Sequence, residues 1–400
     1  LALLLGAGAV ALASAGQLAM PVASALLLLV WAASPVWTWL VSVPRPVPRR
    51  DRLGPDDQAW LRGVASDTWR FYARHVTADD HHLPPDNVQQ VPQEIVAHRT
   101  SPTNIGMYLL SAACAQALGL IGRAELARRL AATLGTLEQL PRWNGHFFNW
   151  YDTLGLVVLP PAYVSTVDSG NCAGHLLAVA GACERLAAAP ADAAGDDAPA
   201  APTWSALAAR CRALALAPQF GPLYDPQRKL LHIGYRAEAC QLDDSHYDLL
   251  ASESRLTSLL AIGKGDVPPA HWAALGRPFF AWGRGLGLKS WSGSMFEYLM
   301  PSLVLDEPVG SVLHQATRSA VQAQQQEGLA HGTPWGISES AIAGQDHTLA
   351  FQYGPQGVAA LAQRRTPADE RVVAPYASAM AVMVAPREAV ANLRALQALG

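Results

Sequence analysis

Charged residues are scarce in this chain: they make up 15% of its 400 residues, and the net charge is only −3. Apart from one short arginine cluster near the start, no basic run is present that could follow the phosphates of a nucleic acid. Half of the residues are apolar, which excludes intrinsic disorder and is enough to build a large core. Nucleic acid is therefore not an expected partner.

Cysteine is also sparse, with five widely spaced residues at positions 114, 172, 183, 211 and 240. There is no CxxC motif, and no Cys/His pair has the spacing of a zinc site. His81 and His82 follow Asp79 and Asp80, but a proline-rich surface loop explains this group as well as a metal does. We expect buried thiols in a reducing compartment, with no metal and no cofactor.

Several catalytic signatures are absent. The chain has no GxSxG elbow, no Walker A loop and no GxGxxG that follows a strand. The run from Gly283 to Gly287 is rich in glycine but lacks a βαβ setting, so we expect a flexible loop there. These absences disfavour the esterase, phosphate-binding and dinucleotide-binding chemistries that the signatures serve.

The first 43 residues are almost wholly apolar. Val22–Val43 is an uncharged run of 22 residues, which as a helix is long enough for the roughly 30 Å of a bilayer core. Four arginines follow between Pro44 and Arg52, which places that side of a membrane in the cytoplasm. A cleaved signal peptide is disfavoured, because no charged segment precedes the run and nothing like Ala-x-Ala leads into Pro44. We predict one or two transmembrane helices in residues 1–43 and a basic juxtamembrane linker at 44–54.

From about residue 55 amphipathic helices alternate with short polar and aromatic segments. Clear strand-like alternation is limited to Lys229–Tyr235, and the low-complexity Ala187–Pro202 indicates a surface loop. Repeated helix pairs with such loops predict an all-α toroid, in which inner helices form a barrel and the loops at one end line a cleft. A helical solenoid is the alternative, although no fixed-length repeat aligns. The predicted helices lie near 58–73, 104–119, 123–139, 171–188, 203–215, 247–263, 293–304, 310–328 and 355–364.

The stretch from Asp243 to Arg255 holds four carboxylates, a His, a Tyr and an Arg in thirteen positions. If a helix begins at Tyr247, Glu253 lies at the edge of its apolar face, where partial desolvation raises the pKa of a carboxyl group. A raised pKa suits a general acid at neutral pH. An ordinary solvated helix start, with a surface pair between Asp248 and Arg255, is the equal alternative.

Glycosyl transfer needs two carboxylates across one bond, and the polar islands of this chain also have the aromatic platforms and hydrogen-bonding groups that sugars require. Glu339 lies in a Gly-Ile-Ser-Glu-Ser turn whose backbone amides favour its ionised form, with a place at a helix start as the alternative. For Glu297 a buried structural role competes equally. Asp168 is either a helix N-cap or a ligand of sugar hydroxyls. Core packing is the alternative for Trp291 and Trp335, but their Ser/Gly-rich turns favour ligand contact.

Eight motifs occur in one order: TSPTNIGMYLLS, GHFFNWYDT, YVSTVDSGNCAGHL, YDLLASESRL, AIGKGDVPPAHWAALGRP, SWSGSMFEYLMP, PWGISESA and VVAPYASAMA. Together, from about residue 55 to the end, they resemble the central glycoamylase-like domain of bacterial cyclic β-1,2-glucan synthases. The resemblance implies an (α/α)6 barrel at residues 55–400 that transglycosylates linear β-1,2-glucan into a ring with retention of configuration. It also implies a place on the cytoplasmic side of the inner membrane, with other domains of the same polypeptide as partners.

Carried over by motif, Glu253 in ASESR is the expected general acid/base and Glu339 in GISES the expected nucleophile. The chain departs from the family where Ser-Ala-Ile-Ala replaces Ser-Ala-Tyr-Asn after Glu339, and it stops before an expected Tyr-Glu segment, so we expect a fragment of a longer protein. An inverting β-1,2-glucanase and a non-catalytic glucan-binding module are the alternatives. The expected substrate-binding residues are Asp168, Asn171, Trp150, Tyr151, Asp152, Asp244, Tyr247, Arg255, Trp291, Glu297, Trp335 and Tyr353.

Overall fold

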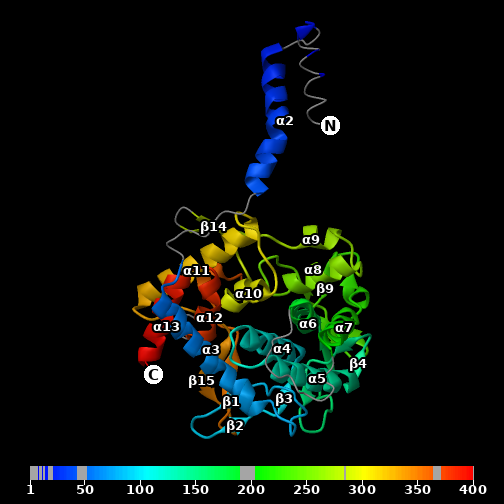
Figure 1. Ribbon diagram of the computed structural model, residues 1–400, viewed down its shortest axis with the longest axis vertical. Helices are drawn as coiled ribbons and strands as arrows, with labels where there is room; N and C mark the ends of the chain where they lie inside the picture. Colours follow the sequence, from blue (N-terminus) through cyan, green and yellow to red (C-terminus); the bar gives the residue numbers. More distant parts are fainter. Residues whose placement is uncertain are drawn as a thin grey trace. The chain divides into compact units, whose positions relative to one another are not determined.

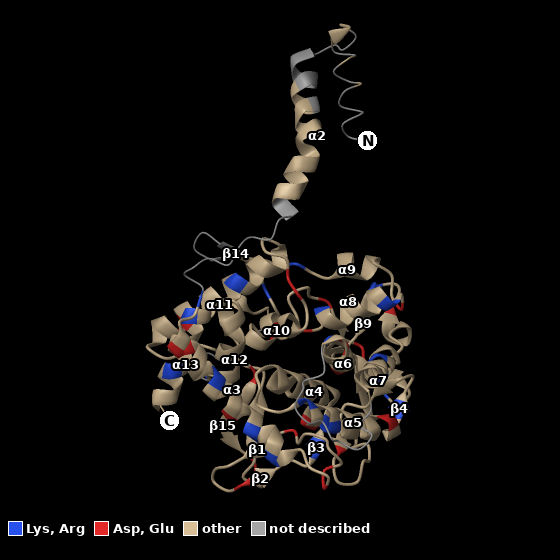
Figure 2. Ribbon diagram, viewed as in Figure 1, with Lys and Arg blue, Asp and Glu red and all other residues tan. Residues whose placement is uncertain are grey.

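The computed structural model describes residues 8, 11, 14–16, 21–42, 52–189, 203–282, 285–363 and 371–399. The chain divides into two compact units, Leu1–Arg50 and Asp51–Gly400, and each is described by itself. In the first unit, helix α2 (Pro21–Ser42) has no charged residue, as Figure 2 shows for its described positions. Within the described part of the chain, no helix combines the length and apolarity that crossing a membrane requires. The predicted transmembrane helices are therefore not supported by the structure.

The second unit is mostly helical (Figure 1), as predicted. The helix expected at 123–139 is found with those bounds, and most of the others differ by a few residues. The segment 355–364 gives only a short 3-10 turn at Ala359–Leu361. The predicted loop at 187–202 and the linker at 44–54 lie largely outside the described residues. The helices are α3 (Pro55–His75), α4 (Pro102–Ala117), α5 (Arg123–Gln139), α6 (Thr166–Ala188), α7 (Trp204–Leu216), α8 (Arg255–Lys264), α9 (Ala270–Ala274), α10 (Met295–Leu299), α11 (Val312–His331), α12 (Pro375–Met380) and α13 (Pro386–Leu399).

Serine caps fix where two central helices begin. Ser101 accepts a hydrogen bond from the backbone N–H of Asn104 and starts α4, with Pro102 in the first turn. Ser165 accepts from the backbone N–H of Asp168 and starts α6. The polar residues that follow each cap therefore lie in a first helical turn.

Helices of the second unit contact one another in a circuit. α3 packs on α4, α4 on α6, α6 on α8, α10 on α12 and α12 on α13, while α5, α7 and α11 pack on members of this circuit. Arg255 at the start of α8 joins α10, because its guanidinium donates to the backbone oxygens of Glu297 and Tyr298 at 2.9 and 2.6 Å. This is the contact order expected of an α/α toroid.

The first and last helices of the unit close the circuit. Arg394 of α13 forms a 3.0 Å ion pair with Asp57 of α3, and its guanidinium lies 4.7 Å from the centre of the Trp60 ring. Figure 1 shows α3, in blue, beside α13, in red. The contact between α3 and α13 therefore joins the two ends of the helical circuit.

Short antiparallel strands are more frequent than predicted. The expected alternation at 229–235 gives two strands in separate sheets: β9 (Leu230–His232) lies between β8 (Tyr224–Asp225) and β12 (His246–Tyr247), and β10 (Gly234–Arg236) lies between β7 (Tyr163–Ser165) and β11 (Gln241–Leu242). The glycine-rich run was expected to be a flexible loop, but part of it is strand β14. The remaining pairs are β1 (Val88–Gln89) with β2 (Ile95–Val96), β3 (Arg99–Thr100) with β6 (Tyr151–Asp152), β4 (Arg142–Trp143) with β5 (His146–Phe147), β13 (Phe279–Trp282) with β14 (Gly285–Leu288), and β15 (Ser340–Gln345) with β16 (Phe351–Gly354).

The cysteines only partly follow the prediction. Cys172, Cys183 and Cys211 are buried thiols of the α4–α7 core. Cys114 and Cys240 are exposed, contrary to expectation.

Candidate active site

The stretch from Asp243 to Arg255 is not one helix, so the predicted polar stripe does not form. His246 and Tyr247 pair with His232 and Leu231 in the β8–β9–β12 sheet, and the chain then turns before α8 begins at Arg255. Pairing between distant strands here overrides the helical periodicity of the sequence. Glu253 consequently lies in the turn that leads into α8.

Glu253 is half-buried, and its carboxyl group lies beside polar side chains of α6. Asn171 of α6 donates to Glu253 Oε2 at 3.3 Å. Burial first, and then the negative charges of Glu339 and Asp168, raise the pKa of Glu253 well above its ordinary value. The carboxyl group thus keeps its proton toward neutral pH, as a general acid requires.

Asp168 and Asn171 face this carboxyl group from the first turns of α6. Thr103 Oγ1 donates to Asp168 Oδ1 at 2.5 Å, and the Asn149 amide is placed to donate to Asp168 Oδ2 at 2.9 Å. Burial raises the pKa of Asp168. One of the two interpretations of Asp168 was a helix N-cap. Ser165 is the N-cap of α6, so that interpretation is wrong.

Glu339 comes from the other half of the unit, just before β15. The Tyr353 hydroxyl of β16 donates to its carboxylate, and the Tyr376 hydroxyl of α12 donates to its backbone oxygen at 2.7 Å. Tyrosine, rather than the predicted backbone amides, is therefore the observed donor. The alternative of a helix start is wrong, because a strand follows Glu339.

Glu253 and Glu339 belong to one electrostatic system although they are distant in sequence. Burial and the charge of Glu297 raise the pKa of Glu339, while hydrogen bonds from Tyr353 and Ser294 act in the opposite direction. The pKa of Glu253 is raised further, partly by the charge on Glu339 itself. When two carboxyl groups interact in this way, the negative charge of one favours the protonated form of the other, so the pair can hold one proton between them.

Comparison with known proteins concerns the fold of the chain. Residues 245–400 match the family model Glycoamylase, described as "Putative glucoamylase". The structure of a "putative glucoamylase" from Bacteroides fragilis superposes with a TM-score of 0.67 and 15% identity, over 89% of this chain and 84% of that one. The chain contains a glycoamylase-like domain.

Two further proteins resemble the glycoamylase-like domain. The cyclic β-(1,2)-glucan synthase NdvB of Rhizobium meliloti is 38% identical over 98% of this chain, which spans 18% of the length of that relative. An endo-β-1,2-glucanase from Chitinophaga pinensis, in complex with sophorotriose and glucose, superposes with a TM-score of 0.62 and 14% identity, over 86% of this chain and 82% of that one. The predicted glycoamylase-like fold is thus confirmed.

Tyr247 also lies close to Glu253 and Asp168. Burial first, and then the charges of Glu253 and Asp168, raise the pKa of its phenol well above the ordinary value, so it stays a neutral donor. Sequence reasoning did not name Thr103, Asn149 or Tyr376 as site residues. Each lies in one of the eight motifs quoted from the sequence, but only its contact with Asp168 or Glu339 marks it as part of the candidate site.

Two charged residues predicted to bind substrate have structural contacts instead. Glu297 accepts hydrogen bonds from the backbone N–H groups of Trp291, Ser292 and Ser294 and from two serine hydroxyls, and so holds the 290–294 loop. Arg255 is 2% exposed and pairs with Glu307 at 2.7 Å. Both the surface pair and the substrate contact proposed for Arg255 are therefore corrected to a buried ion pair.

Two aromatic residues predicted to bind substrate belong to the core. Trp335 is 8% exposed, and both of its backbone polar groups bond Asn392. Tyr151 is fully buried and donates to the backbone oxygen of Pro141 at 2.6 Å. Trp335 and Tyr151 therefore contribute to core packing rather than to ligand contact.

The remaining predicted residues lie nearer the surface. Trp291 is 44% exposed, and its indole N–H donates to Asp248 at 3.0 Å. Trp150 is half-buried under the Arg99 guanidinium, and Asp152 is half-buried in β6. Asp244 is exposed. Of these, Trp291 offers the accessible ring that a sugar platform needs.

The three carboxylates with raised pKa predict a pH-dependent stability. A group whose folded pKa is raised contributes stability that is complete below the ordinary carboxyl pKa and is lost as pH rises through the folded pKa. Glu253→Gln removes the largest of these penalties. We expect the variant to melt above the wild type at about pH 7.5 and level with it at about pH 4. Thermal unfolding at both pH values checks this, and a variant less stable at the higher pH would contradict it.

Proposed function

We propose that the glycoamylase-like domain is a retaining transglycosylase that closes linear β-1,2-glucan into cyclic β-1,2-glucan, on an (α/α)6 toroid. The observation that carries the proposal is the electrostatic coupling of two carboxyl groups: the pKa of Glu253 is raised by burial and by the charge of Glu339, and the Glu339 carboxylate accepts a hydrogen bond from the Tyr353 hydroxyl. The name and identity of the relative NdvB support the choice of substrate.

In this mechanism Glu253 donates its proton to the glycosidic oxygen while Glu339 attacks the anomeric carbon. The bond to the leaving glucan breaks, and a glycosyl ester on Glu339 forms. A hydroxyl from the other end of the same glucan then attacks that carbon, gives its proton to Glu253 and releases Glu339. Two inversions give net retention, and the ring gains no water.

The chain's own residues prepare both steps. Asn171 orients the Glu253 carboxyl through its amide, and Tyr353 stabilises the charge on Glu339 that exists before attack and after release. Asp168 and Tyr247 supply an acceptor and a donor for sugar hydroxyls beside the acid. The proton transfer between Glu253 and the glycosidic oxygen is proposed as direct or through a substrate hydroxyl.

The test incubates the chain with linear β-1,2-glucan. We expect a product that has no reducing end and is one water lighter than the linear glucan of equal length, measured by mass spectrometry and reducing-sugar assay. Only linear fragments with new reducing ends would instead indicate hydrolysis.

A β-1,2-glucanase is the second candidate, because solved endo-β-1,2-glucanases share the fold. In the inverting form, Glu253 still acts as the acid and water replaces Glu339 as the attacking group. Proton NMR of the first-formed anomer separates the two, since retention gives a β product and inversion an α product.

Trp291→Ala tests the proposed sugar platform. We expect glucan affinity to fall about tenfold, which corresponds to about 1.4 kcal/mol, because the half-exposed ring is lost while the core is unchanged. Binding is measured by calorimetry, with the melting temperature as the control for folding. If the domain were only a binding module, this variant would weaken binding while Glu253→Gln and Glu339→Gln left product profiles unchanged. Unchanged affinity would exclude Trp291 from the site.

Attachment to the inner membrane, a cytoplasmic location and other synthase domains as partners stay predictions from the sequence. Their support is the uncharged Val22–Val43 run, the arginines after it, and the greater length of NdvB.

A further inference from the structure

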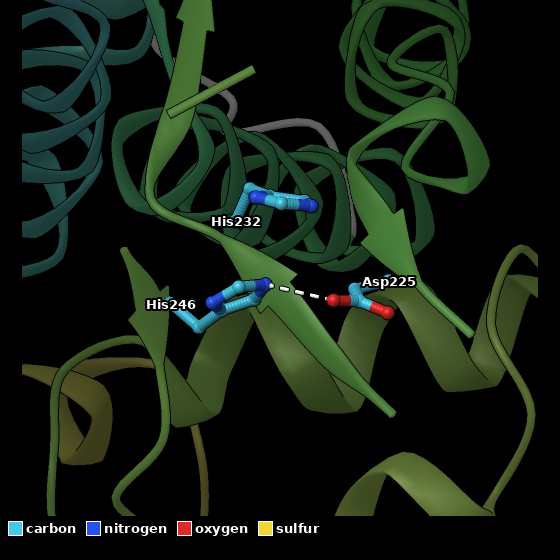
Figure 3. Close-up of side chains that lie close together, drawn as sticks. All are labelled: Asp225, His232 and His246. Carbon is cyan, nitrogen blue, oxygen red and sulfur yellow. Dashed lines mark ion pairs between the residues drawn. The ribbon is translucent and has the colours of Figure 1, made fainter. Parts of the chain in front are cut away.

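A second group of ligating side chains lies on the β8–β9–β12 sheet, apart from the carboxylates described above. One ligand atom each from Asp225, His232 and His246 lie within 4.8 Å of one another. Figure 3 shows the two imidazoles and the carboxylate gathered at one place, each from a different strand. Glycosyl transfer makes no use of these three residues.

Strand register explains why the three side chains meet. His246 is the direct partner of His232, and Asp225 is the partner of Leu230. Residues two apart on one strand point to the same face, so both partner pairs share one face of the sheet. Leu231 and Tyr247 lie on the other face. Because the ligands come from three strands, no Cys/His spacing in the sequence reveals them.

A hydrogen bond of His232 leaves its other ring nitrogen for a ligand, and a ring nitrogen of His246 lies buried close to a carboxylate. His232 Nδ1 donates to the backbone oxygen of Asp243 at 2.5 Å, which fixes Nε2 as the nitrogen with a lone pair. The side chain of His246 is only 6% exposed, and its Nε2 lies 3.2 Å from Asp225 Oδ2. That nitrogen is nevertheless buried without a correctly aligned hydrogen-bond partner among the described residues. Such an orphan atom, aimed at a carboxylate, calls for an electrophilic partner.

We propose that Asp225, His232 and His246 bind a divalent transition-metal ion of the zinc class, with water as the fourth ligand. Two imidazoles and one carboxylate are ligands that Zn²⁺ prefers, and tetrahedral bonds of about 2.1 Å place ligand atoms about 3.4 Å apart. The separation between His246 and Asp225 already fits. The His232 ring lies against the His246 ring, with centroids 4.2 Å apart, so it must turn about its side-chain bonds to aim Nε2 at the ion.

The other charged group near the site does not block the ion. Arg228 Nε lies 4.0 Å from Asp225 Oδ2, but its side chain is largely exposed and can turn into water. The second oxygen, Oδ1, is engaged by the backbone N–H groups of Gln227 and Arg228 at 2.8 and 3.0 Å. The carboxylate is thus oriented by one oxygen and presents the other to the ion.

The ion would hold three short strands together and would thereby help to position the residues of β12 that lie next to the proposed glycan site. β12 is only two residues long, and its second residue, Tyr247, is the phenol beside Glu253 and Asp168. An ion that binds the folded sheet and not the unfolded chain stabilises the folded state by an amount that grows with the logarithm of its free concentration above the dissociation constant. The role is therefore structural, and the ion touches neither carboxylate of the proposed reaction.

The test uses the chain without a polyhistidine tag, stripped of metal by a chelator. We expect calorimetry to show one equivalent of Zn²⁺ bound and a rise in melting temperature with added Zn²⁺. Co²⁺ is expected to give the visible absorption of a tetrahedral site. Asp225→Asn and His246→Gln are expected to weaken Zn²⁺ binding about 100-fold or more. His347→Gln, which removes an exposed histidine, is the control and keeps wild-type binding.

Asp225→Asn keeps an oxygen that can accept both backbone hydrogen bonds, so it is expected to fold even if His246→Gln does not. Failure of the wild type to bind Zn²⁺, or equal binding by wild type and Asp225→Asn, overturns the proposal. Because the readout is metal binding, either result leaves the proposed glycosyl transfer to its own test.

Discussion

Replacing Glu339 with glutamine is expected to lower glycosyl transfer by roughly 10⁴-fold or more. The amide can still accept the hydrogen bond from Tyr353, so the fold and glucan binding are expected to persist. It cannot form the glycosyl ester, because an amide oxygen is a far poorer nucleophile than a carboxylate. The rate of ring formation from linear β-1,2-glucan is the measurement.

Two comparisons make this result specific. Glu388→Gln removes an exposed carboxylate from α13 and is expected to leave the rate unchanged. Glu339→Gly opens space in which azide can attack the anomeric carbon, and a glucosyl azide of inverted configuration is expected if Glu339 is the nucleophile. Ring formation at the wild-type rate by Glu339→Gln would remove the residue from the mechanism altogether.

The sequence predicted the two carboxylates but not the backbone that holds them. The sequence predicts a raised pKa for Glu253 at the edge of a helix that begins at Tyr247. The pKa is indeed raised, but the helix begins only at Arg255, two residues after Glu253. The cause is long-range: His246 and Tyr247 pair with β9, and no local periodicity reports a partner that far away. Burial by distant elements, which sequence cannot give, produces the effect that a helix face was expected to produce.

Packing against distant parts of the chain also decides which of the predicted aromatic and charged residues are accessible to a ligand and which are buried. Trp291 and Trp335 have the same Ser/Gly-rich surroundings in sequence, but only Trp291 keeps an accessible ring in the structure. Glu297 and Arg255 lie in motifs beside the site and serve to hold its loops. A motif therefore identifies the neighbourhood of a site, whereas the direction of each side chain depends on packing.

Arg255→Met is expected to lower the free energy of unfolding by about 3–5 kcal/mol. The Arg255 guanidinium is 2% exposed, and it bonds the Glu307 carboxylate at 2.7 Å as well as the backbone oxygens of Ser252, Glu297 and Tyr298. Methionine fills most of the volume but leaves the Glu307 carboxylate, itself only 11% exposed on its side chain, buried and unpaired. Urea unfolding at neutral pH measures the loss.

A double-mutant cycle separates the unpaired charge from the lost packing. Glu307→Gln added to Arg255→Met is expected to recover part of the loss, because a neutral amide can still accept from Thr317 without an uncompensated charge. Arg70→Met breaks the exposed pair with Asp67 and is expected to cost less than about 1 kcal/mol, since water screens that pair. If Arg255→Met cost no more than Arg70→Met, Arg255 would not join α8 to α10. Since Glu253 lies two residues before Arg255, a displaced α8 is also expected to lower activity together with stability.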